Sequence, residues 1–189
     1  MRFTQRKVQF IAEISGNHLG SLSRAKDLIK EAASAGATAV KLQTYMADTM
    51  TLDIDKFKVD VKHELWGGRK LYDLYNEAFT PWEWHSELFE LCRSLNVIPF
   101  SSPFDLTAVD FLESLDMPIY KIASFENNHI PLLKKIAATG KPVIMSTGIS
   151  TLADIALAVQ TLRSNGCNDI ILLTWFGQAN TQSNDFIIW

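Results

Sequence analysis

The chain has few cysteines, little net charge and no long apolar run, and each shortage excludes a class of protein. Its 189 residues include two cysteines, Cys92 and Cys167, which are too few and too far apart for a metal cluster or a disulfide scaffold. No apolar run approaches the ~20 residues of a membrane span, and the N-terminus lacks an apolar signal core. A formal net charge of −3 offers no basic surface to nucleic acid or to an anionic membrane. We therefore expect a soluble cytoplasmic enzyme, with neither nucleic acid nor a membrane as its partner.

Short apolar segments alternate along the chain with amphipathic helical patterns. Most of these segments are continuously apolar, which is typical of parallel strands covered on both faces. Strands are predicted at residues 8–14, 37–42, 97–100, 119–122, 142–145 and 169–173. The alternation of strands with helices predicts a parallel sheet with right-handed crossovers.

Capping residues mark the expected helix boundaries. One helix is predicted over residues 23–35, with Gly36 as its C-terminal stop. Thr80 and Glu83 have the spacing of a capping box, with Pro81 at the first helical position. Three further helices are expected to begin near Asp105, Pro131 and Thr151.

The expected fold class is α/β, of the parallel (β/α) TIM-barrel type. The alternative is an open doubly wound sheet, but the last crossovers are short and even, and no glycine-rich dinucleotide fingerprint follows the first strand. Because a complete eight-unit barrel usually needs ~250 residues, we expect an incomplete barrel of about six βα units. The long polar and aromatic segment 44–79 follows the second strand, where active-site loops belong.

Two lysines inside otherwise apolar strands are the most informative residues. Since strand residues alternate between the two faces, Lys41 and Gln43 are expected to point into the barrel, as is Lys121 on its own strand. A buried ammonium group without a partner is unfavourable. Two such groups that converge on one cavity indicate an anionic ligand.

Hydroxyls and carboxylates at the same strand ends add to this site. A phosphate or carboxylate ligand could be completed by the hydroxyls of Ser102, Ser124 and Ser146. Alternatively, each lysine pairs with a structural carboxylate such as Glu13 or Glu126. Glu13 is either a general acid/base or simply the counter-ion of Lys41. Glu126 either binds sugar hydroxyls or caps the next helix.

The histidines are expected to be structural rather than catalytic. His18 lies in a tight polar turn, where a histidine is more often a hydrogen-bonding group than a ligand. Solvated positions in helices or loops are expected for His63, His85 and His129.

The polar motifs resemble, in order, those of the sialic acid synthase family. They are AEISGNH (12–18), VKLQT (40–44), FSSPF (100–104), YKIASFE (120–126) and STG (146–148), and the resemblance covers residues 8–173. These enzymes condense phosphoenolpyruvate with an N-acetylated amino sugar to a nonulosonic acid. Residues within 65–85, and Phe125 where N-acetylneuraminate synthases tend to have glycine, resemble the pseudaminic acid synthase branch. This favours a 2,4-diacetamido-trideoxy hexose as acceptor; the alternative is an N-acetylneuraminate or legionaminate synthase.

The resemblance implies a role for each residue of the site. Glu13 becomes the catalytic carboxylate, and the sugar-binding residues become Glu126, Gln43 and Phe125. The contacts to phosphoenolpyruvate become Lys41, Ser102, Lys121, Ser124 and Ser146. A divalent metal, Mn or Mg, is expected for the full-length family member, bound by two histidines that this chain lacks. Full-length relatives are expected to be homodimers.

The end of the chain departs from the family pattern. Residues 1–173 are expected to be the N-terminal part of a synthase barrel, and residues 174–189 a divergent tail produced by truncation or a frameshift. An open six-strand arc exposes two sheet edges. We therefore expect this chain alone to be poorly stable or to associate, and to be inactive. The remaining alternative is a non-catalytic remnant that binds an anion or a partner.

Overall fold

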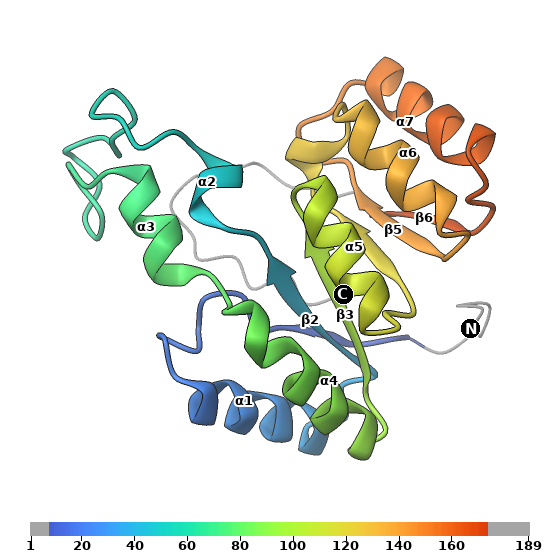
Figure 1. Cartoon of the computed structure of the whole chain (residues 1–189), viewed down its shortest axis with the longest axis horizontal. Coiled ribbons are helices and arrows are strands. Elements are labelled where there is room, and N and C mark those ends of the chain that lie inside the picture. The colour runs from blue at the N-terminus through green and yellow to red at the C-terminus, as the bar shows by residue number, and fades with distance from the viewer. Residues whose placement is uncertain (1–7, 174–189) are drawn as a thin grey trace.

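The sheet of the protein is a curled half-barrel of six parallel strands with helices on its outer face (Figure 1). The structure is a computed structural model and describes residues 8–173. The strands follow one another in chain order: β1 (Ile11–Glu13), β2 (Ala39–Thr44), β3 (Ile98–Pro103), β4 (Tyr120–Ile122), β5 (Val143–Ser146) and β6 (Ile170–Leu173). The predicted order and parallel direction are confirmed. β1 is shorter than predicted, and β3 continues through Ser101 and Ser102 to Pro103.

The helices that connect these strands begin close to the predicted caps. They are α1 (Leu22–Ser34), α4 (His85–Ser94), α5 (Leu106–Ser114), α6 (Ile130–Ala138) and α7 (Leu152–Ser164). Asp105 accepts hydrogen bonds from two backbone N–H groups of α5, and Thr151 forms a capping box with Asp154 at the start of α7. Pro131 lies in the first turn of α6.

The predicted capping box at Thr80 is wrong. A short 3₁₀ turn, η1 (Trp82–Trp84), precedes α4, and the side chain of Thr80 caps neither element. Its Oγ1 atom instead lies 3.2 Å from Nε2 of His18, which is fully buried. A buried imidazole nitrogen needs a hydrogen-bond partner, and that long-range need takes precedence over the local cap. His18 therefore has the structural role expected of it.

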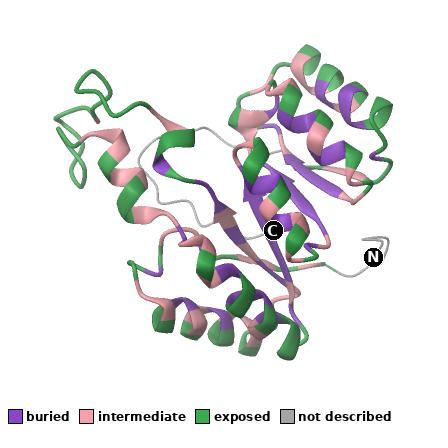
Figure 2. Ribbon diagram, in the orientation of Figure 1, coloured by how far each residue is buried: buried purple, intermediate pink, exposed green. Residues whose placement is uncertain are grey.

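The core lies between the sheet and the outer helices, where Figure 2 shows the strands as mainly buried. Val40 and Leu42 of β2 are buried on the helix side, as are Tyr120 and Ile122 of β4. Lys41 lies between the two buried residues of β2, with its side chain turned to the opposite, inner face. The predicted alternation of faces is confirmed.

The segment between β2 and α4 projects from the carboxyl end of β2, as Figure 1 shows. It contains α2 (Ala47–Met50), α3 (Leu71–Ala78) and an isolated antiparallel bridge between Lys58 and Lys70. Across residues 8–173, no helix has the length and apolar character needed to cross a bilayer.

Candidate active site at the carboxyl ends of the strands

Lys41 and Glu13 form an ion pair at the inner face of the sheet. The parallel register places Glu13 of β1 directly beside Lys41 of β2, and Nζ of Lys41 lies 2.5 Å from Oε2 of Glu13. The lysine side chain is 13% exposed and the carboxylate 36% exposed. Nζ also donates a long hydrogen bond of 3.4 Å to Oγ of Ser102. The ion pair between Glu13 and Lys41, one of the alternatives that the sequence left open, is therefore present.

Lys121 lies deeper and has no such counter-ion. It is 8% exposed, and its Nζ atom donates to the carbonyl oxygen of Ile122 at 2.8 Å and to Oγ of Ser146 at 2.6 Å. No ion pair within residues 8–173 includes it. Burial, followed by repulsion from the Lys41 ammonium group, lowers the pKa of Lys121 to about 7. The two predicted lysines therefore share one electrostatic environment on the inner face.

Glu126 presents an unsatisfied carboxyl oxygen to this environment. A 3₁₀ turn, η2 (Ser124–Glu126), follows β4 and places Glu126 just beyond the carboxyl end of that strand. Oε2 of Glu126 is buried and has no hydrogen-bond partner among the described residues. Burial raises the pKa of Glu126, while the charge on Lys121 partly opposes that shift. Buried polar atoms are normally hydrogen-bonded, so this oxygen is available to a donor on a ligand.

Asn127 is a member of the site that the sequence analysis missed. Its Nδ2 atom donates to the carbonyl oxygen of Ser146 and to Oγ of Ser150, both at 2.7 Å. It therefore joins η2 to the loop after β5 and holds Glu126 and Ser146 in one assembly. Its position directly after the YKIASFE motif was the available signal, but nothing local distinguishes it from a solvated loop asparagine.

The remaining predicted residues lie at the same strand ends. Gln43 and Ser102 are register partners on β2 and β3, so they lie side by side; Gln43 is half-buried and Ser102 buried. Ser124 is half-buried at the start of η2 and, unlike Ser146, does not hydrogen-bond to Lys121. Phe125 points outward from η2 with 76% of its surface exposed.

His85 was expected to be solvated, and this prediction is wrong. The side chain is fully buried, and burial lowers its pKa to about 4. Nδ1 lies 3.2 Å from the carbonyl oxygen of Pro81, which can only accept, so Nδ1 carries the proton and Nε2 accepts. Nε2 lies 2.9 Å from Oγ1 of Thr44, which must donate to it; Thr44 in turn lies 2.7 Å from Oγ of Ser101 and accepts from it. This network joins the carboxyl ends of β2 and β3 on the outer face of the sheet, next to Gln43 and Ser102.

Comparisons with known proteins identify the family of the chain. Residues 28–182 match the NeuB family, so the match extends past residue 173. The chain is 45% identical over 170 residues to the pseudaminic acid synthase of Campylobacter jejuni, which covers 90% of this chain and 50% of the relative. It is 36% identical over 162 residues to the N,N'-diacetyllegionaminic acid synthase of the same species, covering 85% of this chain and 48% of the relative.

A solved structure of a sialic acid synthetase has a similar fold. The N-acetylneuraminic acid (sialic acid) synthetase of Leptospira borgpetersenii, crystallised with citrate, superposes with a TM-score of 0.78 at 26% identity, covering 97% of this chain and 63% of that one. The chain spans about half the length of the curated relatives it matches. By its sequence and its fold, the chain belongs to the NeuB family of sialic acid synthases.

Proposed function

We propose that this chain supplies the phosphoenolpyruvate-binding half of a nonulosonic acid synthase. The observation that carries the proposal is Lys121, a buried ammonium group beside a second lysine and without an ion-pair partner in the described part of the chain. Phosphoenolpyruvate brings a phosphate and a carboxylate, which two lysines and neighbouring serine hydroxyls are suited to bind. The five contacts are Lys41, Ser102, Lys121, Ser124 and Ser146.

In the proposed reaction, carbon 3 of phosphoenolpyruvate forms a bond to the aldehyde carbon of an open-chain N-acetylated amino hexose. The aldehyde oxygen takes up a proton, water adds at carbon 2, and phosphate leaves from the resulting tetrahedral intermediate. The lysines stabilise the charge of the phosphate and carboxylate, and Glu13 moves the proton of the water or of the aldehyde oxygen. Glu13 sits 2.5 Å from Lys41, so the base and the anion-binding group are already adjacent.

The acceptor sugar is assigned to Glu126, Gln43 and Phe125. The unpartnered Oε2 of Glu126 suits a sugar hydroxyl or amide donor, and Gln43 lies at the carboxyl end of β2 beside Ser102. Phe125, exposed on the same 3₁₀ turn as Glu126, is assigned to the acceptor sugar, and its bulk favours the 2,4-diacetamido-trideoxy hexose of a pseudaminic acid synthase. The higher identity to the pseudaminic than to the legionaminic acid synthase supports this choice.

The complete enzyme is proposed to bind a divalent metal, Mn or Mg, which would polarise the aldehyde as a Lewis acid. Within residues 8–173, no three His, Cys, Asp or Glu side chains gather into a metal-binding group. The described residues therefore do not fit the metal by themselves, and no step above depends on it. We assign its ligands, and the dimer contacts of the complete enzyme, to the part of the relatives that this chain does not span.

The chain is further proposed to be cytoplasmic and to be inactive alone. Cys92 and Cys167 are buried free thiols, which suits a reducing, cytoplasmic location. Because the match spans half of the relatives, we propose that the 189-residue chain binds phosphoenolpyruvate but does not turn it over alone. Release of phosphate from phosphoenolpyruvate by the purified chain, with acceptor sugar and manganese present, would overturn this point.

Calorimetry with phosphoenolpyruvate in the absence of metal tests the central claim. The chain is expected to bind at one site, and Lys121→Met is expected to weaken binding at least about tenfold because a charged hydrogen bond to the anion is lost. Lys135→Met is the matched control, since Lys135 pairs with Asp110 on the outer helices. Absence of specific binding would favour the alternative, a non-catalytic remnant.

Acceptor choice is tested separately, on this chain joined to the C-terminal half of a relative. Phe125→Gly is expected to shift turnover toward N-acetylmannosamine with phosphoenolpyruvate affinity unchanged. An unaltered ratio of the two sugars would remove Phe125 from the acceptor site and reopen the neuraminate and legionaminate alternatives.

A further inference from the structure

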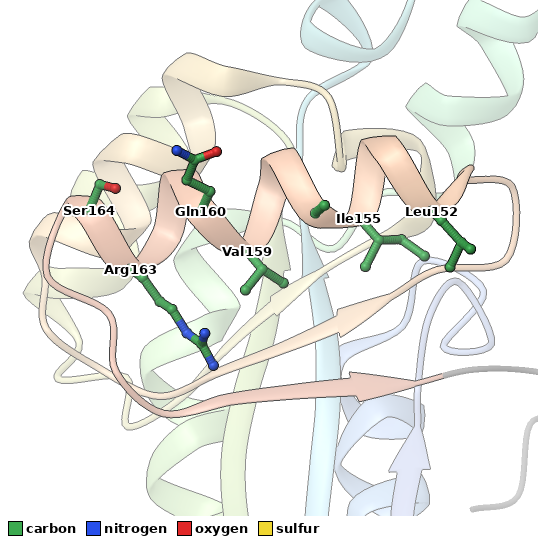
Figure 3. A pocket seen from close by; sticks show the side chains of 7 residues that line it. Leu152, Ile155, Val159, Gln160, Arg163 and Ser164 are labelled. Carbon is green, nitrogen blue, oxygen red and sulfur yellow. The ribbon is translucent and has the colours of Figure 1, made fainter.

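The side-chain amide of Asn127 closes the turn that follows β5. Within this turn, the backbone N–H of Ser150 donates to the carbonyl oxygen of Thr147 at 3.1 Å. Nδ2 of Asn127 donates to the carbonyl oxygen of Ser146, just before the turn, and to Oγ of Ser150, at its end, both at 2.7 Å. The chain then enters α7 at Leu152, labelled at one end of the helix in Figure 3. A single amide group therefore holds the turn at both ends.

The chemistry of these contacts requires an amide nitrogen. An asparagine side chain carries two N–H donors, and the two bonds to the turn use both of them. Because the carbonyl oxygen of Ser146 can only accept, Nδ2 of Asn127 and not Oδ1 must face it. Asn127 is 3% exposed, and its Oδ1 atom is buried without a hydrogen-bond partner among residues 8–173. Each hydrogen bond described for this side chain is thus a donation to the turn.

The carbonyl group that Asn127 holds belongs to the residue whose hydroxyl contacts Lys121. Nζ of Lys121 donates to Oγ of Ser146 at 2.6 Å. A hydroxyl that accepts from an ammonium group keeps its own hydrogen for another acceptor. Ser146 is the last residue of β5, so the turn beyond it influences the direction of its peptide group. By fixing that peptide group, Asn127 restricts where the hydroxyl of Ser146 can point.

We propose that Asn127 is a positioning residue of the anion site: its amide holds Ser146 so that the serine hydroxyl donates to phosphoenolpyruvate beside Lys121. The inference rests on the proposed function and adds a residue to it. The hydrogen bonds described for Lys121 go to Ile122 and Ser146, so Asn127 acts through the serine. Since Asn127 directly follows Glu126, the same amide also ties the anion-binding serine to the residue assigned to the acceptor sugar.

Calorimetry on the 189-residue chain, with phosphoenolpyruvate and no metal, tests this role. Asn127→Leu keeps a similar volume but removes both donors, and it is expected to weaken binding at least about fivefold. Asn128→Ala is the matched control, because Asn128 is the next residue and is exposed; its affinity should equal that of the wild type. Ser150→Ala removes one anchor of the turn and keeps the bond to Ser146, so binding should weaken about twofold. This variant decides the matter if Asn127→Leu does not fold.

A double-mutant cycle separates positioning from a general structural effect. If Asn127 acts through the hydroxyl of Ser146, adding Asn127→Leu to Ser146→Ala should change affinity by less than about twofold, since the group to be positioned is already gone. Damage to the fold would instead weaken binding by the same factor in both backgrounds, and that result would overturn the proposal. So would wild-type affinity in Asn127→Leu and Ser150→Ala. A wild-type chain that does not bind phosphoenolpyruvate would overturn the proposed function and this role with it, whereas binding that ignores Asn127→Leu would overturn this role alone.

Discussion

The Nζ atom of Lys121 lies 2.6 Å from Oγ of Ser146 and 2.8 Å from the carbonyl oxygen of Ile122, so both of its protein partners are uncharged. Lys41, on the same inner face, has Glu13 at 2.5 Å. Both lysines were predicted from the alternation of faces, but in the described part of the chain Lys41 has a carboxylate counter-ion and Lys121 has none. We expect an anionic ligand that contacts both lysines to supply the missing negative charge; three measurements test this expectation, and a fourth concerns the buried His85.

Lys121 should make the free protein less stable at neutral pH than above it. Its pKa is about 7 in the folded protein and ordinarily 10.5, so the unfolded chain holds more protons between these values. The free energy of unfolding therefore rises with pH across this window, and the full penalty applies below about pH 7. Lys121→Met is expected to stabilise the chain by about 1–3 kcal/mol at pH 6, with the difference vanishing above about pH 10.5.

Urea unfolding at several pH values measures this effect, with Lys135→Met as the control for losing a lysine. A Lys121→Met variant that is less stable at every pH would show that the lysine stabilises the fold instead, and would count against a site built for an anion.

Binding of phosphoenolpyruvate should be coupled to proton uptake. Near pH 8.5 Lys121 is largely neutral in the free protein, and an anion beside it raises its pKa again. Uptake approaching one proton is expected from titrations in two buffers of different ionisation enthalpy. Lys121→Arg keeps the charge but cannot release its proton, so binding should persist with no uptake. Equal uptake by the wild type and this variant would assign the proton to another group.

Glu13→Gln should separate binding from chemistry. Removing a carboxylate next to the anion is expected to leave phosphoenolpyruvate affinity unchanged or higher by up to about tenfold, since Lys41 loses its competitor. In a chain completed with a relative's C-terminal half, turnover should fall about 10²–10⁴-fold. Stability should change by no more than about 1 kcal/mol, because the pair is partly exposed. Glu87→Gln, in an exposed pair with Lys26, is the control; unaltered turnover would reduce Glu13 to a counter-ion.

The buried His85 should contribute to acid unfolding. Its pKa is about 4 when folded and 6.5 ordinarily, so between these values the unfolded chain binds the extra proton and stability falls as pH falls. His85→Gln is expected to cost about 1–3 kcal/mol at pH 7 and to flatten this slope. His18, also buried with a lowered pKa, stays in both proteins, so the difference isolates His85. His63→Gln is the exposed control, and an unchanged slope in His85→Gln would mean that His85 is charged when folded.

The strand order, the helix caps at Asp105 and Thr151, and the inward direction of Lys41 and Lys121 could be predicted because they depend on local periodicity and short-range hydrogen bonds. The capping box at Thr80 failed because the competing partner, His18, is 62 positions away. Asn127 and the Thr44–His85 network were missed for the same reason: their partners come from other strands and helices.

The sequence by itself determined which residues line the inner face and which chemistry they carry, since alternation along a strand is a property of the backbone. Only the tertiary structure decided the electrostatic environment of each lysine. Glu13 reaches Lys41, whereas no carboxylate of residues 8–173 forms an ion pair with the buried Lys121. These outcomes depend on desolvation and on distances through space, which elements remote in the chain set together.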